Sequence, residues 1–461
     1  MNDLVTSLTN WTGELAGLLW GNALTLAVLL GMGLYLTLRM GFVQIRGFRH
    51  ALDLVSGRYS KASDAGQISH FQALSTALSA TVGTGNIAGV ATAITLGGPG
   101  ALFWMWMTAF FGMATKFTEC TLALKFRQLD ANGVVAGGPM YTLLHGLNMK
   151  RTAILFASFA LIASFGIGNM VQANSVVDGL GYLYPGLKEH GWLIGLVMAF
   201  LVALVILGGV TRIARVASTI VPVMASIYIC AALFVLFNHA ADIPNAFSII
   251  FNHALNPWAV GGGAVGEAIR WGVARGLFSN EAGLGSSPMA HAAARTNEPV
   301  REGLVAMLEP FIDTLVICTM TGLVIIVTGA YTLGREDLVG AALTAHAFNS
   351  SIGASGAAVV GIGLSLFAFS TIIAWSYYGD RSARFLFGEG AVMPYRVVYC
   401  FLVLIGAAVP LKLVWNIADI TNILMALPNL LSLLLLAGLA QSLKNTYFSG
   451  SNFKADNKAD P

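Results

Sequence analysis

Hydrophobic residues occupy most of the chain in long runs, separated by short polar or charged stretches. The runs are about 20 residues long, which is the length that a helix needs to cross a bilayer, and none alternates like a transmembrane β-strand. Because every backbone group within the hydrocarbon must find an internal partner, such runs predict a helical bundle. We expect eleven membrane-spanning helices, at residues 15–38, 68–96, 100–124, 151–178, 191–210, 215–238, 263–290, 303–330, 354–379, 394–411 and 417–441.

The composition agrees with a protein that lies mostly in lipid. Of 461 residues, 56% are hydrophobic and only 10% carry a charge, whereas about a quarter of the residues of a soluble domain are charged. The formal net charge of +3 is small and gives no reason to expect nucleic acid as a partner. We predict an all-α integral membrane protein of the plasma membrane, which in a bacterium is the inner membrane.

The lysines and arginines indicate how the chain is oriented. None precedes the first predicted span, whereas several follow it between residues 39 and 61, the reverse of a signal peptide. Basic residues concentrate in cytoplasmic loops, and with eleven spans the opposite loops contain only Lys188, Arg335 and Lys412. This asymmetry predicts an N-terminus outside the cell and a C-terminus in the cytoplasm.

The cysteines and histidines show no pattern of a redox or metal centre. Cys120, Cys230, Cys318 and Cys400 fall within predicted spans and form no CxxC pair, so we expect buried apolar side chains. The histidines lack the spacing of a metal-binding pair. We therefore expect no cofactor.

One span is interrupted by residues that a membrane helix rarely combines. The stretch TVGTGNIAGV, residues 81–90, contains three glycines and an asparagine. Its GxGxxxG pattern resembles a nucleotide-binding loop, but no acidic residue follows about twenty residues later to bind a ribose. The glycines also have the spacing of helix-packing notches, an interpretation that is compatible with a break in the helix.

A second interrupted span supports a true break. Residues 272–293, GVARGLFSNEAGLGSSPMAHAA, are weakly hydrophobic and rich in glycine, and NEAG (280–283) follows the order of NIAG (86–89). Each break opens a set of five spans, residues 68–238 and residues 263–443. Because five is odd, the two sets enter the membrane from opposite sides, which predicts an inverted repeat.

Paired breaks at matching places of an inverted repeat are typical of a transporter's binding site. A broken helix frees N–H and C=O groups that are costly to leave unpaired in lipid. The N–H groups at a half-helix N-terminus attract a carboxylate, and the freed carbonyls coordinate a cation such as sodium. An amino acid and a cation together therefore supply the missing partners.

Both interrupted stretches resemble a known family. GTGNIAGVATAITLGGPGALFWMW (83–106) and RGLFSNEAGLGSSP (275–288) are similar to the alanine or glycine:cation symporter family, and the similarity in length and hydropathy covers nearly the whole chain. The resemblance implies sodium-driven uptake of alanine or glycine, with serine as a further candidate. It also implies that protons serve as the coupling ion in some members.

The resemblance implies the leucine-transporter fold, in which two inverted repeats of five helices contain two discontinuous helices. One extra helix precedes them, in agreement with the count of eleven. The implied divisions are an N-terminal helix with a basic cytoplasmic loop (1–67), a first repeat (68–238), an extracellular connection (239–262), a second repeat (263–443) and a disordered cytoplasmic tail (444–461).

The resemblance places the amino acid against both unwound segments. The backbone of residues 84–86 would hold the carboxylate, and Gly276, Phe278 and Ser279 would lie where the second helix unwinds. Gln172 resembles a residue that reaches the polar groups of the ligand, with a hydrogen bond between helices as the alternative. The implied substrate contacts are Thr84, Gly85, Asn86, Gln172, Gly276, Phe278, Ser279, Thr371 and Trp375.

The resemblance places a cation site between the second and ninth spans. Ser370 and Thr371 resemble a pair of hydroxyls that binds sodium together with the carbonyls of Ser79 and Val82. Asn86 is a further implied ligand. Hard oxygen ligands of this kind suit sodium.

Trp375 lies one helical turn after Thr371, on the same face of the ninth span. It resembles a residue that closes the pocket around a very small side chain. Outside that family, packing or an interfacial position is the usual role of a tryptophan in a membrane helix.

Ionisable residues within spans are functional candidates by default, because they are costly in lipid. Asp313 is a candidate cation ligand or proton acceptor, and Glu281 and Arg275 are candidate gate or scaffold partners. Snorkelling or a structural ion pair suffices for the others, which are Lys116, Glu119, Glu267, Arg270 and Glu309.

Two other classes of membrane protein fit the sequence less well. A channel would need a selectivity filter, and an enzyme would need a nucleophile or a metal constellation. The sequence contains neither pattern. We predict a symporter that imports alanine or glycine with sodium by alternating access, and the alternative is a proton-coupled or other small-amino-acid transporter of the same fold.

Overall fold

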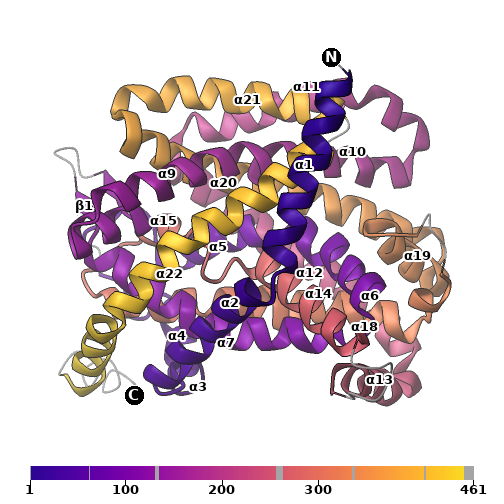
Figure 1. The fold of residues 1–461 in the computed structure, drawn as a ribbon, viewed down its shortest axis with the longest axis horizontal. Coiled ribbons are helices and arrows are strands. Elements are labelled where there is room, and N and C mark those ends of the chain that lie inside the picture. Colours follow the sequence, from indigo (N-terminus) through magenta and orange to yellow (C-terminus); the bar gives the residue numbers. More distant parts are fainter. Residues whose placement is uncertain are drawn as a thin grey trace.

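Helices make up nearly all the regular structure of the protein (Figure 1). The computed structural model describes residues 2–61, 63–129, 134–255, 263–334, 338–409 and 412–450. Seven helices are long and apolar enough to cross a membrane, or nine if each of two bent pairs is one span. The prediction of a helical, multi-span protein is confirmed at this level. Within the described ranges the only strands form a hairpin, β1 (Gln128–Leu129) with β2 (Val135–Ala136).

The N-terminal span is longer than predicted and bent. α1 (Asn2–Gly21) and α2 (Ala23–Arg39) replace the single helix expected at 15–38 and meet at an angle of 43°. The bend falls at Asn22, whose side chain accepts a hydrogen bond of 2.8 Å from a backbone N–H of α2 and so begins a new helix. The basic loop that follows contains α3 (Val43–Arg46) and α4 (Phe48–Val55).

The first half of the chain contains one broken helix, as predicted. α5 (His70–Thr81) is separated from the π-helical turn η1 (Gly85–Gly89) and α6 (Val90–Gly97), with a bend of 53°. Two further π-helical turns follow, η2 (Thr142–Gly146) before the fourth span and η3 (Gly166–Met170) within it. The other helices are α7 (Ala101–Lys125), α8 (Pro139–Tyr141), α9 (Lys150–Phe165), α10 (Val171–Leu183), η4 (Pro185–His190), α11 (Gly191–Ile206) and α12 (Gly209–Asn238), which begins before the expected residue 215.

The second half contains helices in segments that were expected to be loops. α13 (Ile243–Leu255) lies in the predicted extracellular connection, whose residues 256–262 are outside the described ranges, and α19 (Ala341–Ile352) precedes the ninth span. The other elements are η5 (Ala240–Asp242), α14 (Gly263–Asn280), α15 (Pro288–His291), α16 (Pro299–Ala306), α17 (Leu308–Pro310), the π-helical η6 (Phe311–Cys318), α18 (Thr319–Val327), η7 (Ala330–Thr332), α20 (Ala354–Phe387), η8 (Glu389–Ala391), α21 (Val392–Ala408) and α22 (Lys412–Ser449).

The C-terminal prediction needs a correction. α22 continues to Ser449, so the first residues of the expected disordered tail, from 444 onward, are helical. Tyr447 explains this extension, because its buried hydroxyl lies 2.6 Å from Nε2 of His50 on α4. Residues 451–461 lie outside the described ranges.

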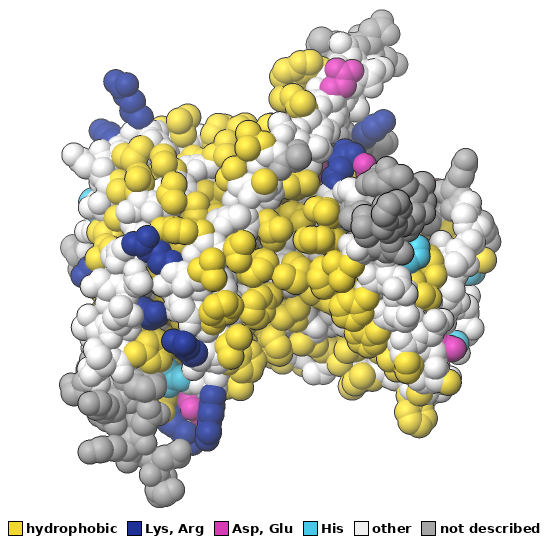
Figure 2. All heavy atoms as spheres, turned by 60° about the horizontal axis from the view of Figure 1, so that its bottom comes forward, with side chains coloured by type: hydrophobic (Ala, Val, Ile, Leu, Met, Phe, Trp, Pro, Cys, Tyr) yellow, Lys and Arg dark blue, Asp and Glu magenta, His cyan; other side chains and the backbone are white. Residues whose placement is uncertain are grey.

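Connecting segments gather at two opposite ends of the molecule. α3, α4, β1 and the C-terminal end lie on the left of Figure 1, whereas α13 and α19 lie on the right. At the left end, the Arg127 guanidinium donates to the carbonyls of Ala65, Ala292 and Thr296 at 2.6–2.8 Å, which joins the loops after the first, third and seventh predicted spans. Hydrophobic side chains cover the middle of the face in Figure 2, and most lysines and arginines lie to one side.

α20 is the central helix of the bundle. It packs against α5, α9, α10, α12 and α19. α10 and α20 approach so closely that a Cβ on Gly361 would lie 2.6 Å from the carbonyl oxygen of Gly179, the small-residue packing that is typical of membrane helices. α20 therefore presents one face to the break between α5 and α6, where the candidate site lies.

Candidate functional site

The first break is held open by one asparagine. The chain leaves the helix at Val82, and the Asn86 side chain accepts a hydrogen bond of 2.8 Å from Gly83 N through Oδ1. A Cβ on Gly83 would lie 2.7 Å from Oγ1 of Thr371 on α20. A glycine is thus required because α20 approaches the broken backbone directly.

The second break begins later than predicted. α14 remains helical through Asn280, so Gly276, Phe278 and Ser279 lie in its last turns and not in an unwound segment. The chain turns only at Glu281, with a φ of 53°, followed by Gly283 at 90°. The left-handed conformation is readily available to glycine, and the glycines that supply it stand after Asn280 and not before it.

A small cavity lies between the two breaks. The cavity has room for about one water molecule. Six of the predicted substrate residues line it, together with Glu281. The full lining is Ala80, Thr81, Gly83, Thr84, Gly85, Ile167, Gln172, Phe278, Glu281, Thr371 and Trp375.

Gln172 presents an unused acceptor in this region. Its Nε2 donates to the carbonyl of Ile167 at 3.1 Å and to Oγ1 of Thr84 at 3.4 Å. Its Oε1 is buried and makes no hydrogen bond within the described residues. Buried acceptors are nearly always paired, so this oxygen is suited to a donor group of a ligand, such as an ammonium.

Trp375 forms another wall and is fixed on two sides. Its Nε1 donates to Oε1 of Glu281 at 3.1 Å, and its side chain packs so closely on η3 that a Cβ on Gly168 would lie 2.4 Å away. The other oxygen of Glu281 accepts from the Ser286 hydroxyl. Glu281 therefore links the second break to α20.

The predicted cation ligands lie where α5 and α20 meet. The Ser79 hydroxyl donates to the carbonyl of Ser370 at 2.8 Å, and the Ser370 hydroxyl lies 3.5 Å from the carbonyl of Ser79. The Thr371 hydroxyl donates to the carbonyl of Phe367 at 3.0 Å. Val82, also buried, is the residue at which the chain leaves α5. The structure thus gathers neutral oxygen groups at this contact.

Three other predicted substrate contacts lie away from the small cavity. Asn86 and Ser279 turn toward Asp313 on η6: Asn86 Nδ2 donates to Oδ1 at 2.6 Å, and the Ser279 hydroxyl donates to Oδ2 at 2.8 Å. Gly276 faces α7, where a Cβ would lie 2.3 Å from Oγ1 of Thr108. Its close approach to α7 explains why a glycine occupies this position.

Asp313 is fully buried and joins the two broken helices. Besides Asn86 and Ser279, the Thr314 hydroxyl donates to it at 2.6 Å. No lysine, arginine or histidine of the described residues forms an ion pair with it. A buried carboxylate is costly without a positive partner, so this position favours a bound cation or a proton.

The whole chain matches one family. A model described as the sodium:alanine symporter family covers residues 5–460. The chain belongs to this family. Its members are transporters and not enzymes, as predicted, and the family name supports sodium as the coupling ion.

Individual relatives agree with this assignment. The sodium/alanine symporter AgcS of Methanococcus maripaludis is 50% identical over 429 residues, which are 92% of this chain and 93% of that protein. The probable sodium/glutamine symporter GlnT of Bacillus subtilis is 39% identical over 423 residues, which are 91% and 86% of the two chains.

A solved structure supports the fold. The crystal structure of MhsT in complex with L-phenylalanine matches with a TM-score of 0.56 and 14% identity, and the match covers 86% of this chain and 93% of that one. At this identity the likeness shows the fold alone, which is that of the leucine-transporter group.

A buried cluster of charged side chains lies beside the second break, and it was not predicted from the sequence. Lys116 Nζ donates to Oε1 of Glu309 at 2.9 Å and to the hydroxyl of Ser287 at 2.6 Å. His291 Nδ1 lies 2.6 Å from Glu302, which also contacts His70 of α5. Lys116 and Glu309 were identified singly as structural charges, but the two histidines and Glu302 were missed, since the partners lie far apart in the sequence. The only local signal of the cluster is that Lys116 and Glu119 stand one helical turn apart within a predicted span.

Arg275 and Glu281 do not interact with each other. The Arg275 guanidinium lies over the rings of Trp271 and Phe278, 5.4 and 5.6 Å from their centroids, whereas Glu281 bonds to Trp375. Arg275 and Glu281, which were predicted as gate or scaffold partners, therefore lie in different regions of this symporter, on either side of Phe278.

Proposed function

We propose that this symporter imports alanine or glycine together with sodium by alternating access. One observation carries the proposal: a small buried cavity is lined by both broken helices and by α20. In the leucine-transporter fold the broken helices form the binding site. In this structure the cavity has room for one water molecule, so it must widen to admit an amino acid, and a side chain that is a methyl group or a hydrogen needs the least widening.

The amino acid is held by groups that the protein leaves available in the cavity. The backbone N–H groups of Thr84 and Gly85, beside the broken backbone, bind the carboxylate, and Oε1 of Gln172 accepts from the ammonium. Trp375 and Phe278 close the space around the side chain. Serine is a further candidate substrate, because its side chain adds only one hydroxyl.

Sodium binds between α5 and α20 in this proposal. Its ligands are the carbonyls of Ser79 and Val82 and the hydroxyls of Ser370 and Thr371. A cation there ties α20 to the break and orders the backbone next to the substrate. Coupling of this kind is reciprocal, so sodium and the amino acid raise each other's affinity by the same factor.

Asp313 supplies a second candidate cation site. Its carboxylate joins Asn86 and Ser279 of the two broken helices and is buried without a positive partner. A sodium ion at this carboxylate would connect the helices directly. A proton at the same place is the basis of the alternative, a proton-coupled transporter.

We further propose eleven crossings with an inverted five-plus-five repeat, an extracellular N-terminus and a cytoplasmic C-terminus. Loops after the first, third and seventh predicted spans meet at one end of the bundle through Arg127. The segment after the second span meets α13 at the other end, where a Cβ on Gly100 would lie 2.5 Å from Ala254 N. This alternation supports the count. Length and hydropathy identify nine spans, and the addition of α7 and α14 brings the proposed number to eleven.

The proposal is tested by uptake of radiolabelled alanine into proteoliposomes. An inward sodium gradient, an inward proton gradient and no gradient are compared, with unlabelled glycine, serine, glutamine and leucine as competitors. We expect concentrative uptake only with sodium, with competition from glycine but not from leucine. Uptake with protons alone would favour the alternative, and inhibition by glutamine would contradict the small pocket. Absence of alanine uptake by folded protein under every gradient would refute the substrate assignment.

A further inference from the structure

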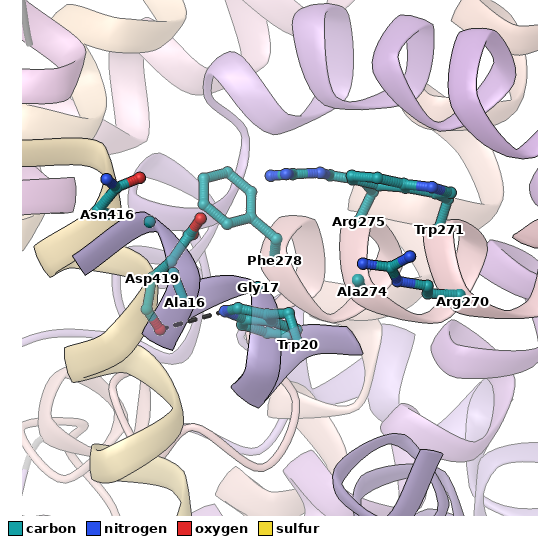
Figure 3. Close-up of a pocket in the computed structure, with 11 residues that line it drawn as sticks. Ala16, Gly17, Trp20, Arg270, Trp271, Ala274, Arg275, Phe278, Asn416 and Asp419 are labelled. Carbon is teal, nitrogen blue, oxygen red and sulfur yellow. Dashed lines mark hydrogen bonds between the residues drawn. The ribbon is translucent and has the colours of Figure 1, made fainter. Parts of the chain in front are cut away.

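A groove opens on the surface between the end of α2 and the end of α22, at the lower left of Figure 1. Its volume is about 330 Å³, which is within the range of about 300–1,000 Å³ that is typical of ligand pockets. α22 packs closely along α1, where Trp20 Nε1 donates to the Asp419 carbonyl at 3.1 Å (Figure 3), but it contacts α2 much less. The looser contact between α2 and α22 leaves the groove open.

Two basic side chains meet in this groove without acidic partners. A Cβ on Gly41 would lie 3.5 Å from Arg46 Nη1 and 3.8 Å from Lys444 Nζ, so the two cations occupy the same small region. Lys444 Nζ donates to the Met40 carbonyl at 2.9 Å, which uses one of its three N–H groups. The Arg46 side chain makes no hydrogen bond within the described residues, and no described carboxylate pairs with either cation. Two like charges held this close to each other favour an anion between them.

Arg39 extends the positive charge along the contact between α2 and α22. Its Nη2 would lie 3.2 Å from a Cβ on Gly438, a position about 9 Å along the helix axis from Lys444. Its Nη1 donates to the neutral Tyr35 hydroxyl at 2.5 Å, and its Nε is buried without a partner among the described residues. The charge of Arg39 is therefore also uncompensated.

Exposed apolar side chains lie beside these cations. Leu38 precedes Arg39 on α2, Ile45 precedes Arg46 on α3, and Leu435 lies one turn before Gly438 on α22; all three are exposed. Phe42 is also exposed, and its φ of 56° is left-handed, a conformation that is costly for a residue with a Cβ. In a membrane protein, exposed side chains of this kind are suited to contact acyl chains. The groove thus combines a place for an anion with apolar flanks.

We propose that this groove binds the headgroup of an anionic phospholipid of the phosphatidylglycerol class. Arg46 and Lys444 donate to the phosphate oxygens, and the acyl chains lie against the exposed leucines of α2 and α22. Basic pockets between membrane helices are suited to anionic headgroups. The bound lipid fills the space between the N-terminal span and the last helix, and the inference does not depend on which substrate is transported.

Snorkelling to water is the ordinary role of basic residues at the end of a membrane helix. Like charges that only reach for water repel each other and favour separate positions. Arg46 and Lys444 instead converge on Gly41, although they come from opposite ends of the sequence. This convergence favours a shared ligand over separate contacts with water.

The test is the thermal unfolding of the delipidated, full-length protein in detergent and potassium buffer, without alanine or sodium. Phosphatidylglycerol, phosphatidylcholine or inorganic phosphate is added at increasing concentration. We expect only phosphatidylglycerol to raise the unfolding temperature, because a ligand of the folded state stabilises it. Arg46→Gln should need at least tenfold more of this lipid for half of the effect, with an unchanged unfolding temperature in its absence. Arg151→Gln removes an exposed charge at the start of α9, outside the groove, and should respond like the wild type.

The other outcomes would overturn the inference at different points. Equal responses of Arg46→Gln and the wild type would show that the lipid binds elsewhere. An equal effect of phosphatidylcholine would exclude recognition of the headgroup charge, and an equal effect of inorganic phosphate would show an anion site that needs no lipid. No response of the wild type to phosphatidylglycerol would exclude the site altogether. The proposed transport function is unaffected by each of these outcomes, because neither alanine nor sodium is present.

Discussion

The two breaks differ in length and in what holds them. The break between α5 and α6 comprises residues 82–84, without a left-handed residue, and Asn86 satisfies it from within its own helix. The break between α14 and α15 comprises residues 281–287 and contains three left-handed residues. Its groups bond to other helices, as in the hydrogen bond of 3.0 Å from Asn429 Nδ2 to the carbonyl of Gly283.

This difference indicates that the two breaks have different roles. The short break leaves backbone groups next to the small cavity, so it is suited to bind a ligand. The long break is tied by Glu281 to α20 and by Ser287 to Lys116, so it is suited to transmit movement to the rest of the bundle. Four substitutions test this comparison.

The largest effect is expected from Lys116→Met. The change leaves Glu309 buried without its lysine partner, with only His291 Nε2 near it at 3.7 Å, and removes the donor to Ser287 of the long break. Breaking a buried ion pair costs about 3–5 kcal/mol, so we expect a large fall in thermal stability in detergent. Lys125→Met, at the end of the same helix, is the control. Equal stability of the two variants would show that the long break does not depend on the cluster.

Asp313→Asn tests the contact that joins the two breaks. It removes the charge that accepts from Asn86 and Ser279, and hydrogen bonds to a charged group contribute about 1.5–3 kcal/mol each. We expect alanine uptake to fall by about two orders of magnitude, with folding retained. Asp178→Asn, an exposed carboxylate in a surface ion pair, should be neutral. Unchanged sodium-driven uptake would exclude Asp313 from the cation pathway.

Thr371→Ala tests the short break and its contact with α20. The loss of one neutral oxygen ligand is expected to cost about 1–1.5 kcal/mol, which corresponds to a roughly tenfold higher sodium concentration for half-maximal uptake. Ser365→Ala, whose hydroxyl donates to a carbonyl of its own helix, is the control on α20. If Thr371→Ala retained the wild-type sodium dependence, the cation site at α5 and α20 would be wrong.

The last comparison is between two glycines at matching places in the repeated sequence, and it measures stability and not uptake. Gly283 has a φ of 90°, so Gly283→Ala should cost about 1–2 kcal/mol of stability. Gly89 lies in a helical turn, and no atom lies within 4 Å of where a Cβ would be added. Gly89→Ala should therefore change stability very little. Thermal unfolding of both variants measures the difference. Equal decreases in the unfolding temperature of the two variants would mean that the long break does not require a left-handed glycine at residue 283.

The sequence predicted a helical protein with several apolar spans and both breaks, because long apolar runs indicate lipid as the solvent and glycine clusters indicate an irregular backbone. It did not predict α13 and α19, which are short and lie between spans. The exact start of the second break was also wrong, since the left-handed residues that define it follow Asn280. Such details depend on conformation and not on hydropathy.

The site was predicted unevenly for similar reasons. Thr84, Gln172 and Trp375, implied by family resemblance, line the small cavity. Asn86 instead turns to Asp313, because the direction of a side chain at a broken helix depends on which partner is nearest. Lys116 and Glu309 are 193 residues apart in the sequence, so no local pattern predicts their contact.

Three of the four π-helical turns in the described residues, η1, η3 and η6, have a mechanical consequence. All three lie beside the residues discussed here: η1 follows the short break, η3 packs on Trp375 and η6 contains Asp313. A helix that loses such an extra residue to regular winding rotates its remaining length by about 100° and shifts it by about 1.5 Å. Each turn is therefore a point where a helix can change its register without unfolding.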